Sequence, residues 1–118
     1  MPTLKGTVTR DNAANSWIFV TPDTIRSGVF SNTEILSLTE SRDAVANLPG
    51  RINTTVQFLD DLTCVTLIEF DSYSNANTAY NMIVNPEPGS TMYVRKQIME
   101  TKRAQSGANY QAVWEIIE

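Results

Sequence analysis

The amino-acid sequence predicts an α+β fold in which helices cover one face of a four-stranded antiparallel sheet. Three observations lead there: two β-rich segments are joined by a short turn, apolar residues recur at helical spacing before and after this hairpin, and an apolar strand ends the chain. The chain has 118 residues, and a chain of this size buries about two thirds of its unfolded surface. We expect one domain over residues 1–118, with a short N-terminal extension over about residues 1–15.

The composition excludes several kinds of site. The chain has no histidine, one cysteine and a net charge of −4. Without histidine it lacks the commonest general base, metal ligand and haem ligand, and one cysteine forms neither an internal disulfide nor a zinc cluster. The acidic balance disfavours nucleic acid, and the short apolar runs predict neither a signal peptide nor a membrane span. We therefore expect a cytoplasmic protein with no metal, no cofactor, no nucleic-acid partner and no membrane contact.

The first half of the chain predicts two strands and a helix. Residues 4–9 alternate weakly between apolar and polar and predict a short edge strand, whereas residues 17–20 (Trp-Ile-Phe-Val) predict a strand that is buried on both faces. Asn32 is expected to cap the helix, with Thr39 or Ser41 as alternative caps. The Pro-Gly pair at residues 49–50 ends it.

The middle of the chain predicts an antiparallel hairpin of residues 51–60 and 63–70. The short loop places Phe58 opposite Cys64. One face of this hairpin is apolar and faces the core, and the other mixes leucine and valine with threonine and glutamine. Mixed sheet faces often meet another subunit. We therefore expect a homodimer through the second face, whose residues include Thr55, Gln57, Leu59, Val65 and Leu67.

Two helices and a strand complete the chain. The first helix has an apolar stripe formed by Ala76, Ala79, Tyr80 and Ile83. Ser90 caps the second helix, which runs to about residue 105. Its basic residues are expected to be mostly solvated, and they are Arg95, Lys96, Lys102 and Arg103. With a last strand over residues 110–117, the order of elements is that of the split βαβ, or ferredoxin-like, fold.

Short motifs on either side of the hairpin resemble a known superfamily. They are Leu-Pro-Gly at residues 48–50 and Glu-Phe-Asp-Ser at residues 69–72, which leads into Ala76, Ala79 and Tyr80. Over roughly residues 17–117 the chain resembles the dimeric α+β-barrel superfamily, which includes antibiotic-biosynthesis-monooxygenase-like and stress-responsive barrel domains. The resemblance implies that two subunits pack sheet against sheet, and that each has a small-molecule cleft between its helices and its sheet.

Three functions stay open at this point. The first is the binding of a lipid-like or aromatic molecule, held by area burial against a wall of Ile18, Val20, Val56, Phe58, Cys64, Ile68, Phe70, Tyr80 and Ile83. The second is a cofactor-free monooxygenase or isomerase that acts on a small aromatic or polyketide-like substrate, with Tyr80, Tyr73 and Trp17 as candidate catalytic residues. The third is a structural or interaction module. For each of these aromatic residues, the alternative interpretation is that the side chain simply packs in the hydrophobic core.

Two further side-chain interpretations complete the sequence-based expectations. Cys64 is expected to point into the core and to be chemically inert, because burial disfavours the thiolate. An ion pair is expected between Arg51 and Glu69, which lie near the ends of neighbouring strands.

Overall fold

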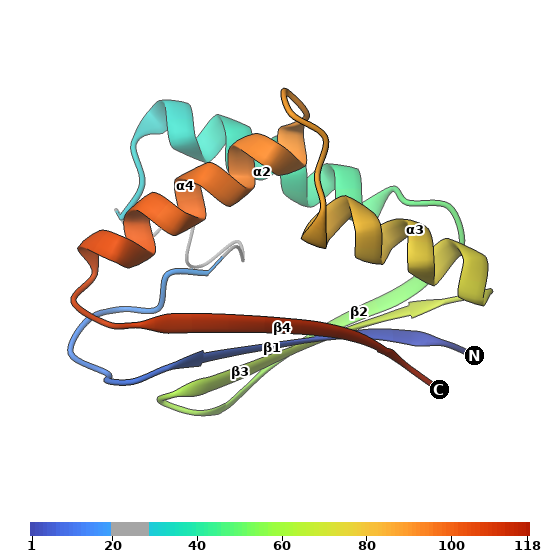
Figure 1. The fold of residues 1–118 in the computed structure, drawn as a ribbon, viewed down its shortest axis with the longest axis horizontal. Coiled ribbons are helices and arrows are strands. Elements are labelled where there is room, and N and C mark those ends of the chain that lie inside the picture. The colour runs from blue at the N-terminus through green and yellow to red at the C-terminus, as the bar shows by residue number, and fades with distance from the viewer. Residues whose placement is uncertain (20–28) are drawn as a thin grey trace.

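The computed structural model describes residues 1–19 and 29–118, and the predicted fold class is confirmed. Within these residues, four antiparallel strands form one sheet and three helices lie on one of its faces (Figure 1). The elements are β1 (Thr3–Arg10), α2 (Asn32–Ala46), β2 (Arg51–Asp60), β3 (Thr63–Phe70), α3 (Tyr73–Val84), α4 (Thr91–Gln105) and β4 (Tyr110–Ile117). The spatial order β2-β3-β1-β4 is that of the split βαβ fold.

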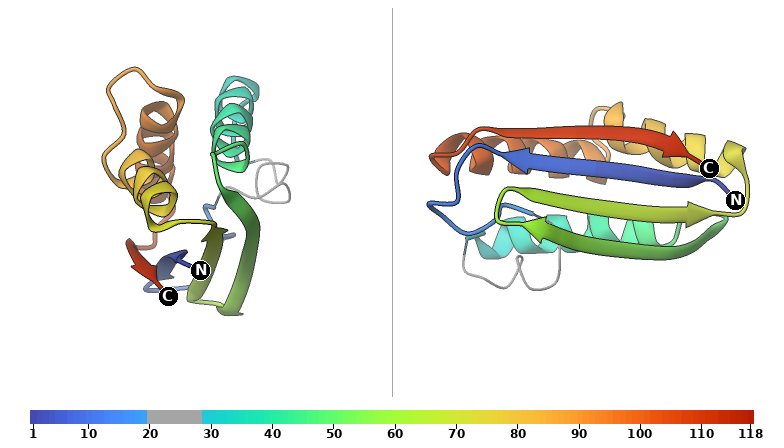
Figure 2. Two further views of the ribbon diagram at one scale, coloured as in Figure 1. Left: turned by 90° about the vertical axis from the view of Figure 1, so that its right-hand side faces the viewer. Right: turned by 90° about the horizontal axis from the view of Figure 1, so that it is seen from below.

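The strand β1 lies in the middle of the sheet, between β3 and β4, so the expected edge position of residues 4–9 is wrong (Figure 2). Leu4, for example, pairs with Ile68 of β3 on one side and with Ile116 of β4 on the other. Every second residue of β1 is buried. The alternation looks weak in the sequence because two of these buried positions hold Gly6 and Arg10 instead of large apolar residues.

The strand expected at residues 17–20 is also wrong: residues 17–19 form no strand, and Val20 lies outside the described residues. Ile18 and Phe19 are buried all the same. The backbone N–H of Ile18 donates to the Tyr110 hydroxyl at 3.2 Å, and its carbonyl accepts from Nε and Nη2 of Arg103 at 3.3 Å. Side chains therefore replace the ladder of a sheet as partners for this buried backbone.

The hairpin of β2 and β3 has the predicted register, with Phe58 opposite Cys64 and Val56 opposite Thr66. At its open end the backbone N–H of Asp71 donates to the carbonyl of Gly50 at 2.9 Å. This bond joins the two motifs on which the family resemblance depends. Gly50 has φ 75°, a left-handed conformation that glycine adopts without steric cost.

Serine residues cap all three described helices. Ser31 caps α2, one residue before the expected Asn32 and well before Thr39 and Ser41. Its hydroxyl accepts from the N–H of Glu34, whose carboxylate accepts from the N–H of Ser31 at 2.8 Å. This reciprocal capping box needs a glutamate three residues after the cap, and only Ser31 has one at that spacing. Ser90 caps α4 as predicted.

The sheet has one face toward the helices and one face without a cover among the described residues (Figure 2). The main core lies between α3 and the sheet and includes Leu4, Ile68, Phe70 and Ile83. Thr55 and Gln57 pair with Leu67 and Val65 on the uncovered face. Leu59 lies at an irregularity of the β2–β3 register and is 61% exposed. No helix in the described part of the chain is both long and apolar enough to cross a membrane.

Candidate ligand-binding cleft

Two adjoining cavities lie between the helices and the sheet. The larger, of about 730 Å³, is bounded by α3, α4 and β4. The smaller, of about 270 Å³, lies between α2 and the strands β2 and β3. We call them the large chamber and the small chamber. They adjoin because they share four lining residues, which are Phe19, Ile83, Arg95 and Trp114.

Small residues open the large chamber. Ala104 and Ala108, at and beyond the end of α4, and Ala112 in β4 line it. The Trp114 indole lies across β1, over Gly6, where an added Cβ would be 2.6 Å from the ring. Gly6 is therefore required for the position of Trp114, and Trp114 in turn forms part of the wall of both chambers.

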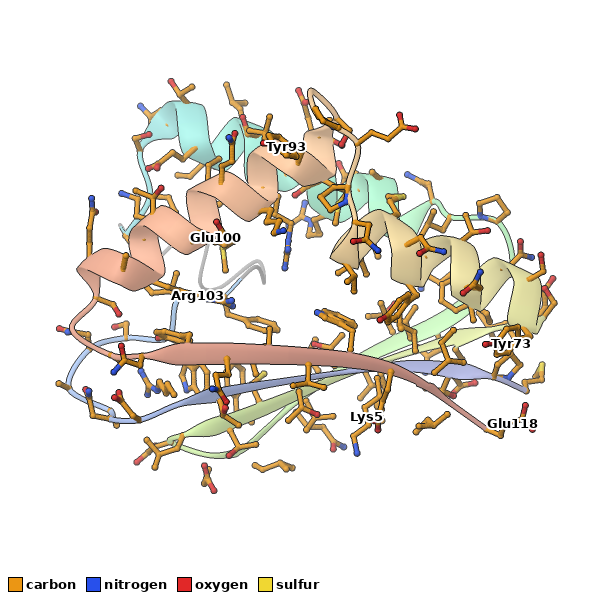
Figure 3. The ribbon with its side chains drawn as sticks, in the orientation of Figure 1. Lys5, Tyr73, Tyr93, Glu100, Arg103 and Glu118 are labelled. Carbon is orange, nitrogen blue, oxygen red and sulfur yellow. The ribbon has the colours of Figure 1, made fainter. Side chains whose placement is uncertain are left out.

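The side of α4 that faces the sheet carries two arginines, contrary to the prediction that they are mostly solvated. Met92 and Met99 are buried. Arg95 lies three residues after Met92, and Arg103 lies four residues after Met99, so both arginines belong to the same stripe of the helix. Arg95 lines both chambers and Arg103 lines the large one. Figure 3 shows Arg103 beneath α4, between that helix and the sheet.

The guanidinium of Arg95 has no polar partner within residues 1–19 and 29–118. Neither a hydrogen bond nor an ion pair links its side chain to any other described residue. Burial, and to a smaller extent the nearby charge of Arg103, lower the pKa of Arg95 to about 10. The side chain is therefore still protonated at neutral pH, and it brings an uncompensated positive charge to the wall between the chambers.

Arg103 has partners and a structural role. It donates to the Ile18 carbonyl, and its guanidinium lies 5.0 Å from the centre of the Tyr110 ring, a cation–π arrangement. Burial lowers the pKa of Arg103, and the phenol of Tyr110 opposes that shift. Arg103 therefore fixes residues 17–19 over the sheet, and it also adds positive charge to the large chamber.

The lining of the chambers is basic although the chain is acidic. Five of its nine lysines and arginines line one chamber or the other, and these are Arg42, Arg51, Arg95, Lys96 and Arg103. Among the described lining residues only Glu100 is acidic. Arg51 donates to the Ala46 carbonyl at 2.7 Å and to Thr54 at 3.2 Å, and the expected pair with Glu69 does not form.

The residues proposed from the sequence as a ligand wall lie partly in the chambers and partly in the core. Ile18 is buried but lines neither chamber, and the prediction is wrong for Phe58, which is 48% exposed and lines neither chamber because its strand β2 lies at the edge of the sheet. Val56, Ile68 and Ile83 line the small chamber, and Tyr80 and Ile83 line the large one. Cys64 and Phe70 are completely buried in the core and line neither. Burial raises the pKa of the Cys64 thiol to about 11, as expected for a thiol in apolar surroundings.

The three candidate catalytic residues lie in different places. Only Tyr80 lines a chamber. Tyr73 is at the first turn of α3 and is 60% exposed (Figure 3). Trp17 packs against Phe58, with ring centres 5.6 Å apart, and beneath the guanidinium of Arg10 at 4.2 Å.

The ligand wall proposed from the sequence did not include Arg95, Arg103, Tyr110 and Trp114, all of which line the cleft. The available signal was the spacing in α4, where arginines alternate with methionines along one stripe. Trp114 and Tyr110 alternate with outward residues of β4, but nearly every position of that strand is apolar, so its inner face cannot be recognised from the pattern. No group of three or more possible metal ligands occurs among the described residues.

Comparison with known proteins finds solved structures only. No family model and no curated protein matches the chain. The chain is similar to SnoaB, a cofactor-independent oxygenase from Streptomyces nogalater, with 14% identity and a TM-score of 0.46 over 95% of this chain and 89% of that one. It is also similar to an antibiotic biosynthesis monooxygenase, with 9% identity and a TM-score of 0.46 over 98% and 96% of the two chains.

The strand order and registers of this chain define its class as a ferredoxin-like α+β protein, and the two chambers form a cleft between its helices and its sheet.

Proposed function

We propose that this protein binds a small molecule in the cleft formed by the two chambers. The observation that supports this most is the pair of adjoining cavities, of about 730 and 270 Å³. Together they have the size of a typical small-molecule site. Ile68, Met92 and Trp114 give the small chamber an apolar wall, which suits an aromatic or lipid-like body.

A cavity-filling variant tests this proposal. Ala112 lines the large chamber, so Ala112→Phe should occupy the space that a ligand would take. Binding of the uncharged fluorophore N-phenyl-1-naphthylamine is measured by fluorescence, and gently purified protein is examined by mass spectrometry for a retained molecule. Ala13→Phe is the matched control, since Ala13 is exposed in the loop after β1.

We expect the wild type and Ala13→Phe to bind the fluorophore, and Ala112→Phe to bind it at least tenfold more weakly, because a filled site loses the contacts that bury apolar area. A wild type that retains no molecule and binds no fluorophore would contradict the proposed function. Equal binding by Ala112→Phe would show that the fluorophore binds elsewhere, and would contradict it as well.

A cofactor-free monooxygenase or isomerase is the second candidate function. The observation that favours it is that Tyr80, Tyr110 and Arg95 line one chamber. A guanidinium favours the ionised form of a bound hydroxyaromatic molecule, and phenols can hold or move its proton. Dihydroxynaphthalenes, followed by absorbance and oxygen uptake, are suitable test substrates.

We expect Tyr80→Phe to lower turnover of any dihydroxynaphthalene that reacts, whereas Tyr73→Phe, on the exposed first turn of α3, should not. Turnover that is the same in both variants and in the wild type would exclude Tyr80 as a catalytic residue. The third candidate function is that of a structural or interaction module. It does not explain the two chambers, and only the uncovered sheet face supports it.

The homodimer predicted from the sequence is proposed on that same face. Leu67 is partly accessible there and Val113 is 59% exposed. Lys5 lies on the same face between Leu67 and Glu115, and the face also carries several threonines and glutamines. A second copy of the chain would cover the apolar groups, and the opposite charges of Lys5 and Glu115 lie next to each other on the sheet. The oligomeric state in solution tests this proposal.

A further inference from the structure

We propose that the cleft selects an amphipathic anion, whose acidic group pairs with Arg95 while its apolar body occupies the small chamber. This inference rests on the proposed function, because it names the class of small molecule that the cleft binds. The class is a rigid or aliphatic apolar body that carries one oxyanion, such as a carboxylate.

The position of Arg95 supports this assignment. Arg95 is one of four residues that line both chambers, and the other three, Phe19, Ile83 and Trp114, are apolar or aromatic. An acidic group beside Arg95 therefore lies at the boundary, and its apolar body extends toward Met92 and Ile68 in the small chamber. A guanidinium suits this role because its planar fork donates two parallel hydrogen bonds to one carboxylate.

The partners of the other arginines in the lining distinguish Arg95 from them. Arg42 pairs with Asp43 at 3.5 Å, Arg51 donates to the Ala46 carbonyl at 2.7 Å, and Arg103 donates to the Ile18 carbonyl at 3.3 Å. Among the described residues, Arg95 has no such bond. A charge that is partly buried and has no partner is costly, and an oxyanion would supply both the missing charge and the missing hydrogen bonds.

The charge of the surroundings favours the same class of ligand. The chain has a net charge of −4, yet the described residues that line the chambers carry five basic side chains and one acidic one. The local potential in the cleft is therefore positive within a molecule that is negative overall. Walls of low dielectric concentrate such a field, so an anion is favoured there over a neutral molecule of the same shape.

A pair of probes that differ only in charge tests this inference. The fluorophore 1-anilinonaphthalene-8-sulfonate is N-phenyl-1-naphthylamine with one added sulfonate. We expect the wild type to bind the sulfonate at least tenfold more tightly than the uncharged compound, since charge-assisted hydrogen bonds contribute roughly 10- to 100-fold in affinity. As competitors, 2-naphthoate should displace the fluorophore and its uncharged methyl ester should do so more weakly.

Arg95→Met removes the charge and keeps most of the length of the side chain. We expect it to weaken binding of the sulfonate at least tenfold and to leave binding of the uncharged fluorophore unchanged or stronger. Lys102→Met is the matched control, because Lys102 lies on the same helix, pairs with Glu34 at 3.2 Å and lines neither chamber. It makes the same change in net charge and should bind both probes as the wild type does.

The outcomes separate the two proposals. If the wild type binds both probes with equal affinity, or if Arg95→Met binds the sulfonate as tightly as the wild type does, the anion preference is wrong while the binding cleft stands. If the wild type binds neither probe, the proposed function fails and this inference fails with it. The comparison of probes on the wild type needs no variant, so it remains decisive even if Arg95→Met does not fold.

Discussion

At the scale of single residues, the unpaired charge of Arg95 opposes stability. Arg95 lines the small chamber together with Ile83, Met92 and Trp114, and burial lowers its pKa to about 10. The charged form is thus less favourable in the folded chain than in the unfolded one. Binding residues often have this property, because the group that will meet a ligand is kept without a partner in its absence.

We therefore expect Arg95→Met to raise the free energy of unfolding at neutral pH by about 1–2 kcal/mol, as replacement of buried charges by apolar side chains often does. Urea denaturation of the wild type and the variant measures this difference. Lys102→Met should lower stability slightly, by about 0.5 kcal/mol, because it breaks a partly exposed ion pair with Glu34. A loss of stability in Arg95→Met would mean that the guanidinium makes a structural contribution.

Cys64 provides a pH-dependent contribution with a definite sign. Burial raises the pKa of its thiol from 9.0 to about 11, so the unfolded chain loses this proton at lower pH than the folded chain does. The thiol therefore contributes stability that is fully present below pH 9 and is lost as the pH rises from 9 to about 11.

We expect wild-type stability to fall over this interval by on the order of 1–2 kcal/mol more than that of Cys64→Ala. Chemical denaturation at several alkaline pH values measures both curves. Since tyrosines and other groups titrate equally in the two proteins, the difference between the curves isolates the thiol. Parallel curves would contradict the assigned burial of Cys64.

At the scale of the elements, β1 determines the shape of the cleft through Gly6. The strand passes beneath Trp114 of β4, with which Gly6 is paired, and the indole occupies the space that a side chain at residue 6 would need. The pairing of a glycine with a tryptophan across two neighbouring strands therefore holds the wall between the chambers in place.

We expect Gly6→Ala to reduce stability by about 1–3 kcal/mol, the usual cost of overpacking, and to move the indole. Thermal denaturation measures the first effect, and near-ultraviolet circular dichroism follows the second. Thr7→Ala, at the next residue of β1 on the uncovered face, serves as the control and should change neither. In a Trp114→Leu background the cost of Gly6→Ala should largely disappear, and simple additivity of the two substitutions would contradict the proposed contact.

At the scale of the whole molecule, the uncovered sheet face is the feature that a dimer would explain. Val65 is only 7% exposed within one chain, where it lies between Thr7 and Gln57 of the neighbouring strands. Val65→Asp would therefore destabilise the fold of the subunit as well as any dimer. This variant does not distinguish loss of the dimer from loss of the fold. Leu67 lies on the same face and is more accessible, so it is the better position for a test.

We expect the wild type to sediment as a dimer at micromolar concentration and Leu67→Asp to sediment as a folded monomer, because a carboxylate on an apolar interface is poorly solvated. Analytical ultracentrifugation together with circular dichroism makes this measurement. Leu36→Asp is the control, since Leu36 is 68% exposed on α2, on the helix side of the sheet; it should remain dimeric. A monomeric wild type would exclude the proposed interface.

The local sequence pattern was sufficient to predict most of the fold. The register of β2 and β3, the stripe of α3 with Ala76, Ala79 and Ile83 buried, and the cap of α4 follow from residues close together in sequence. It was insufficient for β1, because Gly6 occupies a buried position that a large apolar residue would normally mark. It was also insufficient for residues 17–19, whose backbone partners, Tyr110 and Arg103, come from the far end of the chain.

The amino-acid sequence alone determined the α+β class, the hairpin and the division of the hairpin strands into two faces, because apolar periodicity and turn residues act over a few neighbouring positions. Only the tertiary structure decided which strand lies at the centre and which side chains line the cleft. The direction in which Arg95 points depends on where α4 crosses the sheet. That crossing depends in turn on packing against α2 and on the space left by alanines and a glycine in other elements, and no local pattern records it.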